Sequence, residues 1–215
     1  MRAFLDRFHQ RLEGPLLPSV RLILLLLVIP LVLTFTAPLW RISLAAPQYP
    51  RGLVLDIYAY KIDGGNGGQH LREINNLNHY IGMHAINRAE LSDLDWMPFA
   101  LGALALLTLR CAAVGNVRAL VDLAVLGSYV GVFALGRFAY RMYVYGHNLD
   151  PNAPFKVEPF TPALLGSKQL ANFVTTSLPQ LGAVWISLFL GGTAVMALWQ
   201  LVRPRRERTA ASPTP

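Results

Sequence analysis

Two polar stretches of the chain hold most of the side chains that could bind a metal ion. Only His9, of the five histidines, lies outside them. The first stretch contains His70, His79 and His84, and the second contains His147. Imidazole is the commonest metal-binding side chain at neutral pH, so a metal site is the first chemistry to consider.

The string NLNHYIGM suggests which metal this would be. Its His79 and Met83 stand four residues apart, so they share one helix face if the helix continues past Gly82. Thioether sulfur selects Cu(I), and imidazole accepts either copper oxidation state. Zinc and calcium sites use more cysteine, histidine or carboxylate ligands than this face offers. The sequence predicts a copper site with the ligand set His79, Met83, His84 and His147.

A structural role for the same side chains is the alternative. His79 and Met83 would then pack a small loop fold against the membrane surface, and His147 would be a hydrogen-bonded loop residue.

Other chemistry has less support. Cys111 is the only cysteine, which excludes an intramolecular disulfide, a CxxCH haem site and a cysteine-based metal site. No Ser-His-Asp set, phosphate loop or carboxylate pair is evident, so we expect no enzyme.

Four apolar runs must position these polar stretches. Hydrophobic residues make up 53% of the chain and charged residues only 14%, compared with about 25% charged in a soluble domain. A helix needs about 20 apolar residues to cross the hydrocarbon core. No run contains a histidine, which excludes a bis-histidine haem b. We predict an all-α membrane protein with about four transmembrane helices, at residues 20–40, 97–115, 119–138 and 178–202.

Arginines outside the runs orient these helices. They gather in residues 1–19 and 203–215 and flank the turn at 116–118, which marks the cytoplasmic side of a bacterial inner membrane. Both termini are therefore predicted to be cytoplasmic, with residues 41–96 and 139–177 as periplasmic loops. The net charge of +7 then reflects topology, and we expect no nucleic-acid partner.

The first apolar run is predicted to be an uncleaved anchor. The segment before it contains Asp6 and Glu13, and the run is longer than the 7–15 residues of a signal-peptide core. Ser43-Leu44-Ala45 resembles a cleavage site, so a cleaved signal peptide is the alternative.

Short elements are expected in the periplasmic loops. Leu53–Ile62 is rich in β-branched and aromatic residues, which predicts a strand. Gly64–Gly68 is a flexible turn, and apolar residues at helical spacing then predict an amphipathic helix from Gln69 to about Tyr80. In the second loop, Thr175-Ser177-Pro179 is predicted to cap the fourth transmembrane helix.

Two features are expected to matter inside the bilayer. Gly127 and Gly131 form a GxxxG step that allows another helix to approach closely. Asp122 lies one turn after Arg118, which predicts an i,i+4 ion pair. A proton-relay role for Asp122 is the alternative, since acids inside membranes are often functional.

The two loops resemble a known family. The strings IYAYKIDGGNGGQHLREINNLNHYIGM and DPNAPFKVEPFTPALLGSKQLANF are similar to small multi-pass bacterial membrane proteins associated with maturation of copper enzymes, notably nitrous-oxide reductase in denitrification. Leu77–Met83 is the most specific part of the resemblance. It implies a periplasmic or membrane copper enzyme, or its maturation proteins, as the partner.

Two classes of function follow from these observations. The first is a membrane-anchored accessory or assembly factor that handles copper at the periplasmic face. The second is a non-catalytic membrane subunit or anchor of a respiratory complex, with the loops as a docking surface. A transporter ranks third, because it would need homo-oligomerisation to supply enough helices. Membrane lipid is an expected partner in each case.

Overall fold

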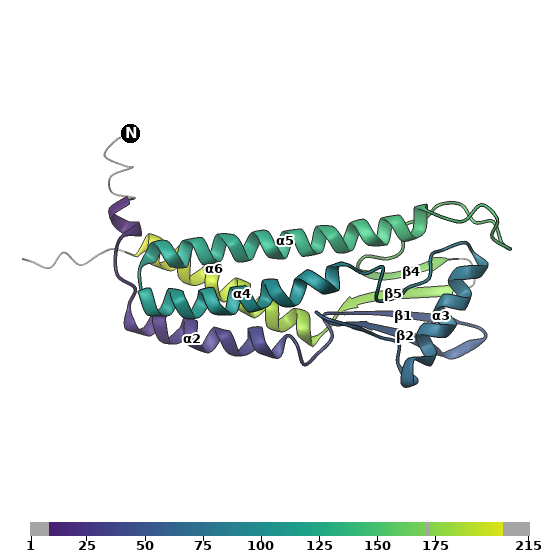
Figure 1. The fold of residues 1–215 in the computed structure, drawn as a ribbon, viewed down its shortest axis with the longest axis horizontal. Helices are drawn as coiled ribbons and strands as arrows, with labels where there is room; N and C mark the ends of the chain where they lie inside the picture. The colour runs from purple at the N-terminus through teal and green to yellow at the C-terminus, as the bar shows by residue number, and fades with distance from the viewer. Residues whose placement is uncertain (1–8, 171–172, 204–215) are drawn as a thin grey trace, which may run out of the picture.

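The computed structural model describes residues 9–170 and 173–203. Figure 1 shows two parts: long helices lie side by side in a bundle, and five strands with one further helix form a head at one end of it. The first and last described residues lie at the opposite end of the bundle (Figure 1). We call that opposite end the base.

The bundle consists of four helices: α2 (Pro18–Leu33), α4 (Asp93–Val114), α5 (Val117–His147) and α6 (Leu181–Val202). By length and composition, α4, α5 and α6 could each cross a membrane. The 16 residues of α2 are apolar but span only about 24 Å. Since α2 packs against both α4 and α6, it belongs to the same bundle.

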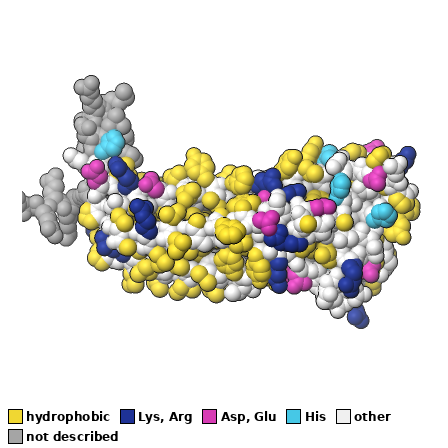
Figure 2. Space-filling model, viewed as in Figure 1, with side chains coloured by type: hydrophobic (Ala, Val, Ile, Leu, Met, Phe, Trp, Pro, Cys, Tyr) yellow, Lys and Arg dark blue, Asp and Glu magenta, His cyan; other side chains and the backbone are white. Residues whose placement is uncertain are grey.

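Apolar side chains cover most of the face of the bundle that Figure 2 shows, while charged side chains gather at its two ends. Each helix exposes large hydrophobic residues: Leu26 of α2 is 53% exposed, Leu106 of α4 70%, Val132 of α5 71% and Leu198 of α6 62%. Monomeric soluble proteins rarely expose continuous apolar surface of this kind. The surface and the three long helices together suggest a membrane protein, as predicted.

The bundle interior uses the predicted GxxxG step. A Cβ added at Gly127 would lie 2.9 Å from Leu190 of α6, and one added at Gly131 would lie 3.0 Å from it. Leu190 therefore packs against the two glycines, where α5 and α6 approach closely. The expectation that these glycines admit a neighbouring helix is confirmed.

The first apolar run does not stay helical to Trp40. The hydroxyl of Thr36 donates to the carbonyl of Leu33 at 2.8 Å, in the turn that ends α2. Pro38 follows, and proline cannot donate the backbone hydrogen bond that a continuing helix needs. The end of the run then extends into the first strand.

Five strands form a single antiparallel sheet in the order β3-β2-β1-β5-β4. They are β1 (Trp40–Ala46), β2 (Tyr49–Ile57), β3 (Ile62–Asp63), β4 (Gly166–Leu170) and β5 (Phe173–Pro179). The central strand β1 pairs with β2 on one side and β5 on the other. One sheet thus joins the two polar stretches that flank the long helices.

One face of the sheet is covered by a helix. After the short 3₁₀ helix η1 (Asn66–Gly68), α3 (Gln69–Tyr80) packs on β2, and its Ile74 is buried with Leu53 and Leu55. The predicted amphipathic helix is confirmed with the predicted bounds, because its apolar spacing is a local signal.

The prediction of an all-α fold is wrong, because the five-stranded sheet makes the fold mixed. The predicted strand at Leu53–Ile62 corresponds only to parts of β2 and β3. Thr175-Ser177-Pro179 is part of β5 and not a helix cap. Sequence windows do not reveal this pairing, since Ser43 lies opposite Thr176, which is 133 residues further along the chain.

The base is tied together by the segment that precedes α2. Pro15 forms a β-bridge with Asn116, which stands between α4 and α5. The N–H of Leu16 donates to the carbonyl of Gly115 at 2.7 Å, and an Nη of Arg21 donates to the same oxygen at 3.3 Å. These contacts fix the turn that joins α4 to α5.

Candidate docking site at the tip of the head

The C-terminal end of α3 determines whether His79 and Met83, two of the predicted copper ligands, share a helix face. The N–H of Met83 donates to the carbonyl of Asn78 at 2.9 Å, and the N–H of Gly82 donates to that of His79 at 3.3 Å. With Gly82 at φ +78°, this is the Schellman arrangement that ends a helix. The helix does not persist past Gly82, so Met83 does not continue the face that carries His79.

The second polar stretch packs against this helix end. The N–H of Asp150 donates to the carbonyl of Gly82 at 2.8 Å, and the N–H of Phe155 donates to that of Tyr80 at 2.9 Å. A Cβ at Gly82 would lie 2.8 Å from the Asp150 carbonyl oxygen. Gly82 is therefore required both for its positive φ and for this close approach. The two stretches do meet, as the copper hypothesis requires.

The histidines at this junction have other hydrogen-bond partners. His84 Nε2 lies 3.2 Å from the side-chain nitrogen Nδ2 of Asn148. His147 Nδ1 lies 2.9 Å from the carbonyl oxygen of Tyr143, and the two rings stack at 3.9 Å. A carbonyl only accepts, so Nδ1 of His147 carries the proton and Nε2 is the nitrogen that a neutral ring offers a ligand.

Residues 9–170 and 173–203 contain no group of three or more His, Cys, Asp or Glu side chains that could hold a metal ion. The structure brings His84 close to the segment after His147, while His79 is exposed and contacts Tyr80. Copper binding by His79, Met83, His84 and His147 stays a prediction from the sequence.

The same region exposes a group of aromatic rings, which we call the tip patch: His79, Tyr80 and Phe155. The rings of His79 and Tyr80 are 6.3 Å apart, and those of Tyr80 and Phe155 are also 6.3 Å apart. Tyr80 is 51% exposed and Phe155 63% exposed. Exposed aromatic clusters on a fixed backbone are typical of protein interaction surfaces.

A polar cleft of about 320 Å³ lies between β2 and the start of α3. At its edge the hydroxyl of Tyr49 donates to Glu73 at 2.6 Å, and this hydrogen bond raises the pKa of the Tyr49 phenol. His70 Nδ1 accepts the N–H of Val54 at 3.2 Å, so His70 caps the open edge of β2. The structure therefore gives His70 a structural role. No local pattern pairs Tyr49 with Glu73, which lies on a different element.

A partly buried ion cluster joins the start of α4 to α5. Asp93, at the start of α4, accepts from Nε of Arg137 at 2.8 Å and from Nε of Arg141 at 3.3 Å, both on α5. The indole of Trp96 donates to the same carboxylate at 3.0 Å. The two arginines hold the start of α4 against α5, and Trp96 adds a donor from α4 itself.

Comparison of the chain with protein-family models, with curated proteins and with solved structures finds no match. The resemblance to copper-enzyme maturation proteins is thus an expectation from the sequence.

Proposed function

We propose that the protein is a membrane-anchored, non-catalytic accessory subunit whose head docks a partner protein through the tip patch. The observation that carries this proposal is the exposure of Tyr80 and Phe155 on backbone fixed by hydrogen bonds between two distant stretches. Aromatic side chains dominate the binding energy of protein interfaces, and fixed backbone lowers the entropy lost on binding.

The resemblance supplies the class of partner. A periplasmic or membrane copper enzyme, or one of its maturation proteins, would meet a head that stands on the periplasmic side of the inner membrane. The bundle would anchor the head, and copper chemistry would belong to the partner.

We propose the topology from the arginines at the base. The base contains four arginines: Arg11, Arg110, Arg118 and Arg203. Five further arginines predicted to be cytoplasmic lie outside the described residues: Arg2, Arg7, Arg205, Arg206 and Arg208. Because arginines gather at the base, we place the base on the cytoplasmic side of the membrane. In this topology α2 crosses the membrane alongside α4, α5 and α6. Reporter fusions after Arg118 and Arg203 are expected to report cytoplasm, and fusions after Gly65 and Lys156 periplasm. A periplasmic signal after Arg203 would contradict this orientation.

The docking proposal is tested by photo-crosslinking in native membranes. A photoreactive phenylalanine at position 155 is expected to give one discrete protein adduct, whereas the same group at Leu165, which is 69% exposed, is not. Replacing Tyr80 with serine should weaken the adduct at position 155 by about tenfold or more, the effect of losing an interface hot spot. Titration of the identified, purified partner should show the same ratio between wild type and Tyr80→Ser.

Equal adducts at positions 155 and 165, or equal binding by the Tyr80→Ser variant, would contradict docking at the tip patch. A Cu(I) competition titration of the same purified proteins separates the copper hypothesis. Stoichiometric Cu(I) binding that is lost in both His79→Ala/Met83→Ala and His84→Ala/His147→Ala would make copper handling the better account.

A further inference from the structure

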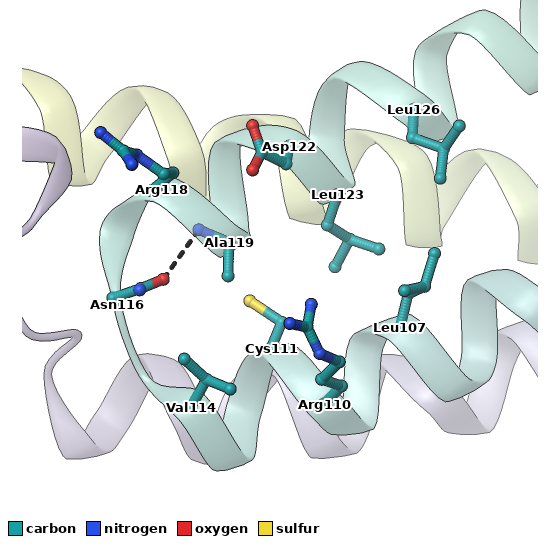
Figure 3. A pocket seen from close by; sticks show the side chains of 10 residues that line it. All are labelled: Leu107, Arg110, Cys111, Val114, Asn116, Arg118, Ala119, Asp122, Leu123 and Leu126. Carbon is teal, nitrogen blue, oxygen red and sulfur yellow. Dashed lines mark hydrogen bonds between the residues drawn. The ribbon is translucent and has the colours of Figure 1, made fainter.

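A cavity of about 290 Å³ lies between α4 and α5, next to the turn at the base (Figure 3). Its polar lining is Arg110, Asn116, Arg118 and Asp122, and its apolar walls include Leu107 and Leu126. In Figure 3, Arg110 extends beside Cys111 into the space between the helices, and Leu107 and Leu126 point toward each other across it. None of these residues belongs to the tip patch.

The arginines at this cavity are poorly neutralised by the protein. Among residues 9–170 and 173–203, no ion pair involves Arg110, and Arg118 has only Glu13 at 4.0 Å. The side chains of that pair are 51% and 73% exposed, so the attraction is weak. The predicted ion pair of Arg118 with Asp122 is not among those that the described residues form. The lining thus has two cations and one anion.

A further donor faces the same space. The side-chain oxygen of Asn116 accepts the N–H of Ala119 at 2.8 Å at the start of α5, which leaves the amide nitrogen to donate. Two guanidinium groups and an amide suit the oxygens of a phosphate, since arginine forms paired hydrogen bonds with phosphate oxygens.

The apolar walls select the kind of phosphate compound. Leu126 is 42% exposed and Val114 49% exposed, and both belong to the apolar outer surface of the bundle. A free phosphate would gain nothing from these walls, whereas an acyl chain lying along them would be buried from water. A cavity with a cationic end and an apolar wall therefore matches a phospholipid, with its headgroup at the base.

We infer that this cavity binds the phosphate headgroup of an anionic phospholipid. The inference rests on the proposed membrane placement, with the base at the cytoplasmic surface, where anionic lipids attract basic residues. Basic pockets between transmembrane helices on that side are suited to phosphate headgroups. The bound lipid would bridge α4 and α5 at the end opposite the Asp93 cluster.

Native mass spectrometry of the full-length protein with added phosphatidylglycerol tests the inference. Wild type is expected to retain one phosphatidylglycerol molecule in preference to phosphatidylcholine. Each of Arg110→Gln and Arg118→Gln should weaken this binding by about fivefold. Asp122→Asn removes the anion of the lining and should strengthen it. Arg203→Gln is the matched control, because Arg203 also lies at the base but stacks on Trp199 outside the cavity.

Three results would overturn the inference: equal retention of the two lipids by wild type, an equal loss in Arg203→Gln, or displacement of the lipid by millimolar inorganic phosphate. The last result would indicate a site for free phosphate. Reporter fusions and crosslinking at position 155 are measured independently, so failure of the lipid site is distinguishable from failure of the proposed function.

Discussion

Replacing Asp93 with alanine is expected to lower the free energy of unfolding by about 2–3 kcal/mol. The side chain is only 14% exposed and accepts hydrogen bonds from Arg137, Arg141 and Trp96. Its loss leaves two partly buried guanidinium groups facing each other without an anion, and removing one partner of such a pair costs more than the pair itself contributes. This cost is below that of breaking a fully buried pair because the arginines are 31% and 27% exposed.

Asp95 provides the matched control for this prediction. It lies in the same first turn of α4 and forms an ion pair with Arg88 at 2.7 Å, but its side chain is 66% exposed. Asp95→Ala should therefore cost less than about 1 kcal/mol. The measurement is equilibrium unfolding in detergent, followed by circular dichroism. Equal losses in the two variants would mean that the Asp93 cluster does not hold the start of α4 against α5.

The sequence predicts the bundle better than the head, for a physical reason. Length and hydropathy are properties of one segment, so α4, α5 and α6 are recognisable without their neighbours. α3 is equally local, since its apolar stripe repeats within 12 residues. The strands β4 and β5 are short, and they become strands through pairing across the sheet, β5 with β1 and β4 with β5. The β-branched residues Val174, Thr175 and Thr176 favour a strand at β5, whereas β4 contains no such residue.

The candidate site shows the same limit. The gathering of the two histidine-bearing stretches follows from the sheet, which no sequence window contains. The position of Met83 relative to His79 could be predicted from the local sequence, because a glycine after the last apolar residue of a helix commonly marks its C-terminal end. Reading Gly82 that way separates His79 from Met83. The exposure of Tyr80 and Phe155 follows from packing between segments more than 70 residues apart in the sequence, since Phe155 donates its N–H to Tyr80.

Gly146→Ala is expected to loosen the head locally and to destabilise the protein by about 2 kcal/mol, the cost of overpacking. Gly146 lies in the last turn of α5, where its carbonyl accepts the N–H of Phe160 at 2.9 Å. An added Cβ would stand 1.8 Å from the carbonyl oxygen of Phe160 and 3.0 Å from Pro162. The backbone carbonyl of Phe160 cannot move away by a simple rotation, as the end of a flexible side chain can. The segment at Phe160 must therefore shift, which breaks its hydrogen bond to α5.

Gly136 in the same helix provides the control, because a Cβ added there meets no atom of the described residues within 4 Å. Gly136→Ala should be neutral or stabilise the helix by up to about 1 kcal/mol, since alanine is the better helix former. Thermal unfolding in detergent should show a lower melting temperature for Gly146→Ala and an unchanged or higher one for Gly136→Ala. Hydrogen exchange at the Phe160 amide should accelerate in Gly146→Ala alone. Unchanged exchange at Phe160, together with equal melting of the two variants, would show that the last turn of α5 does not hold the segment leading to β4.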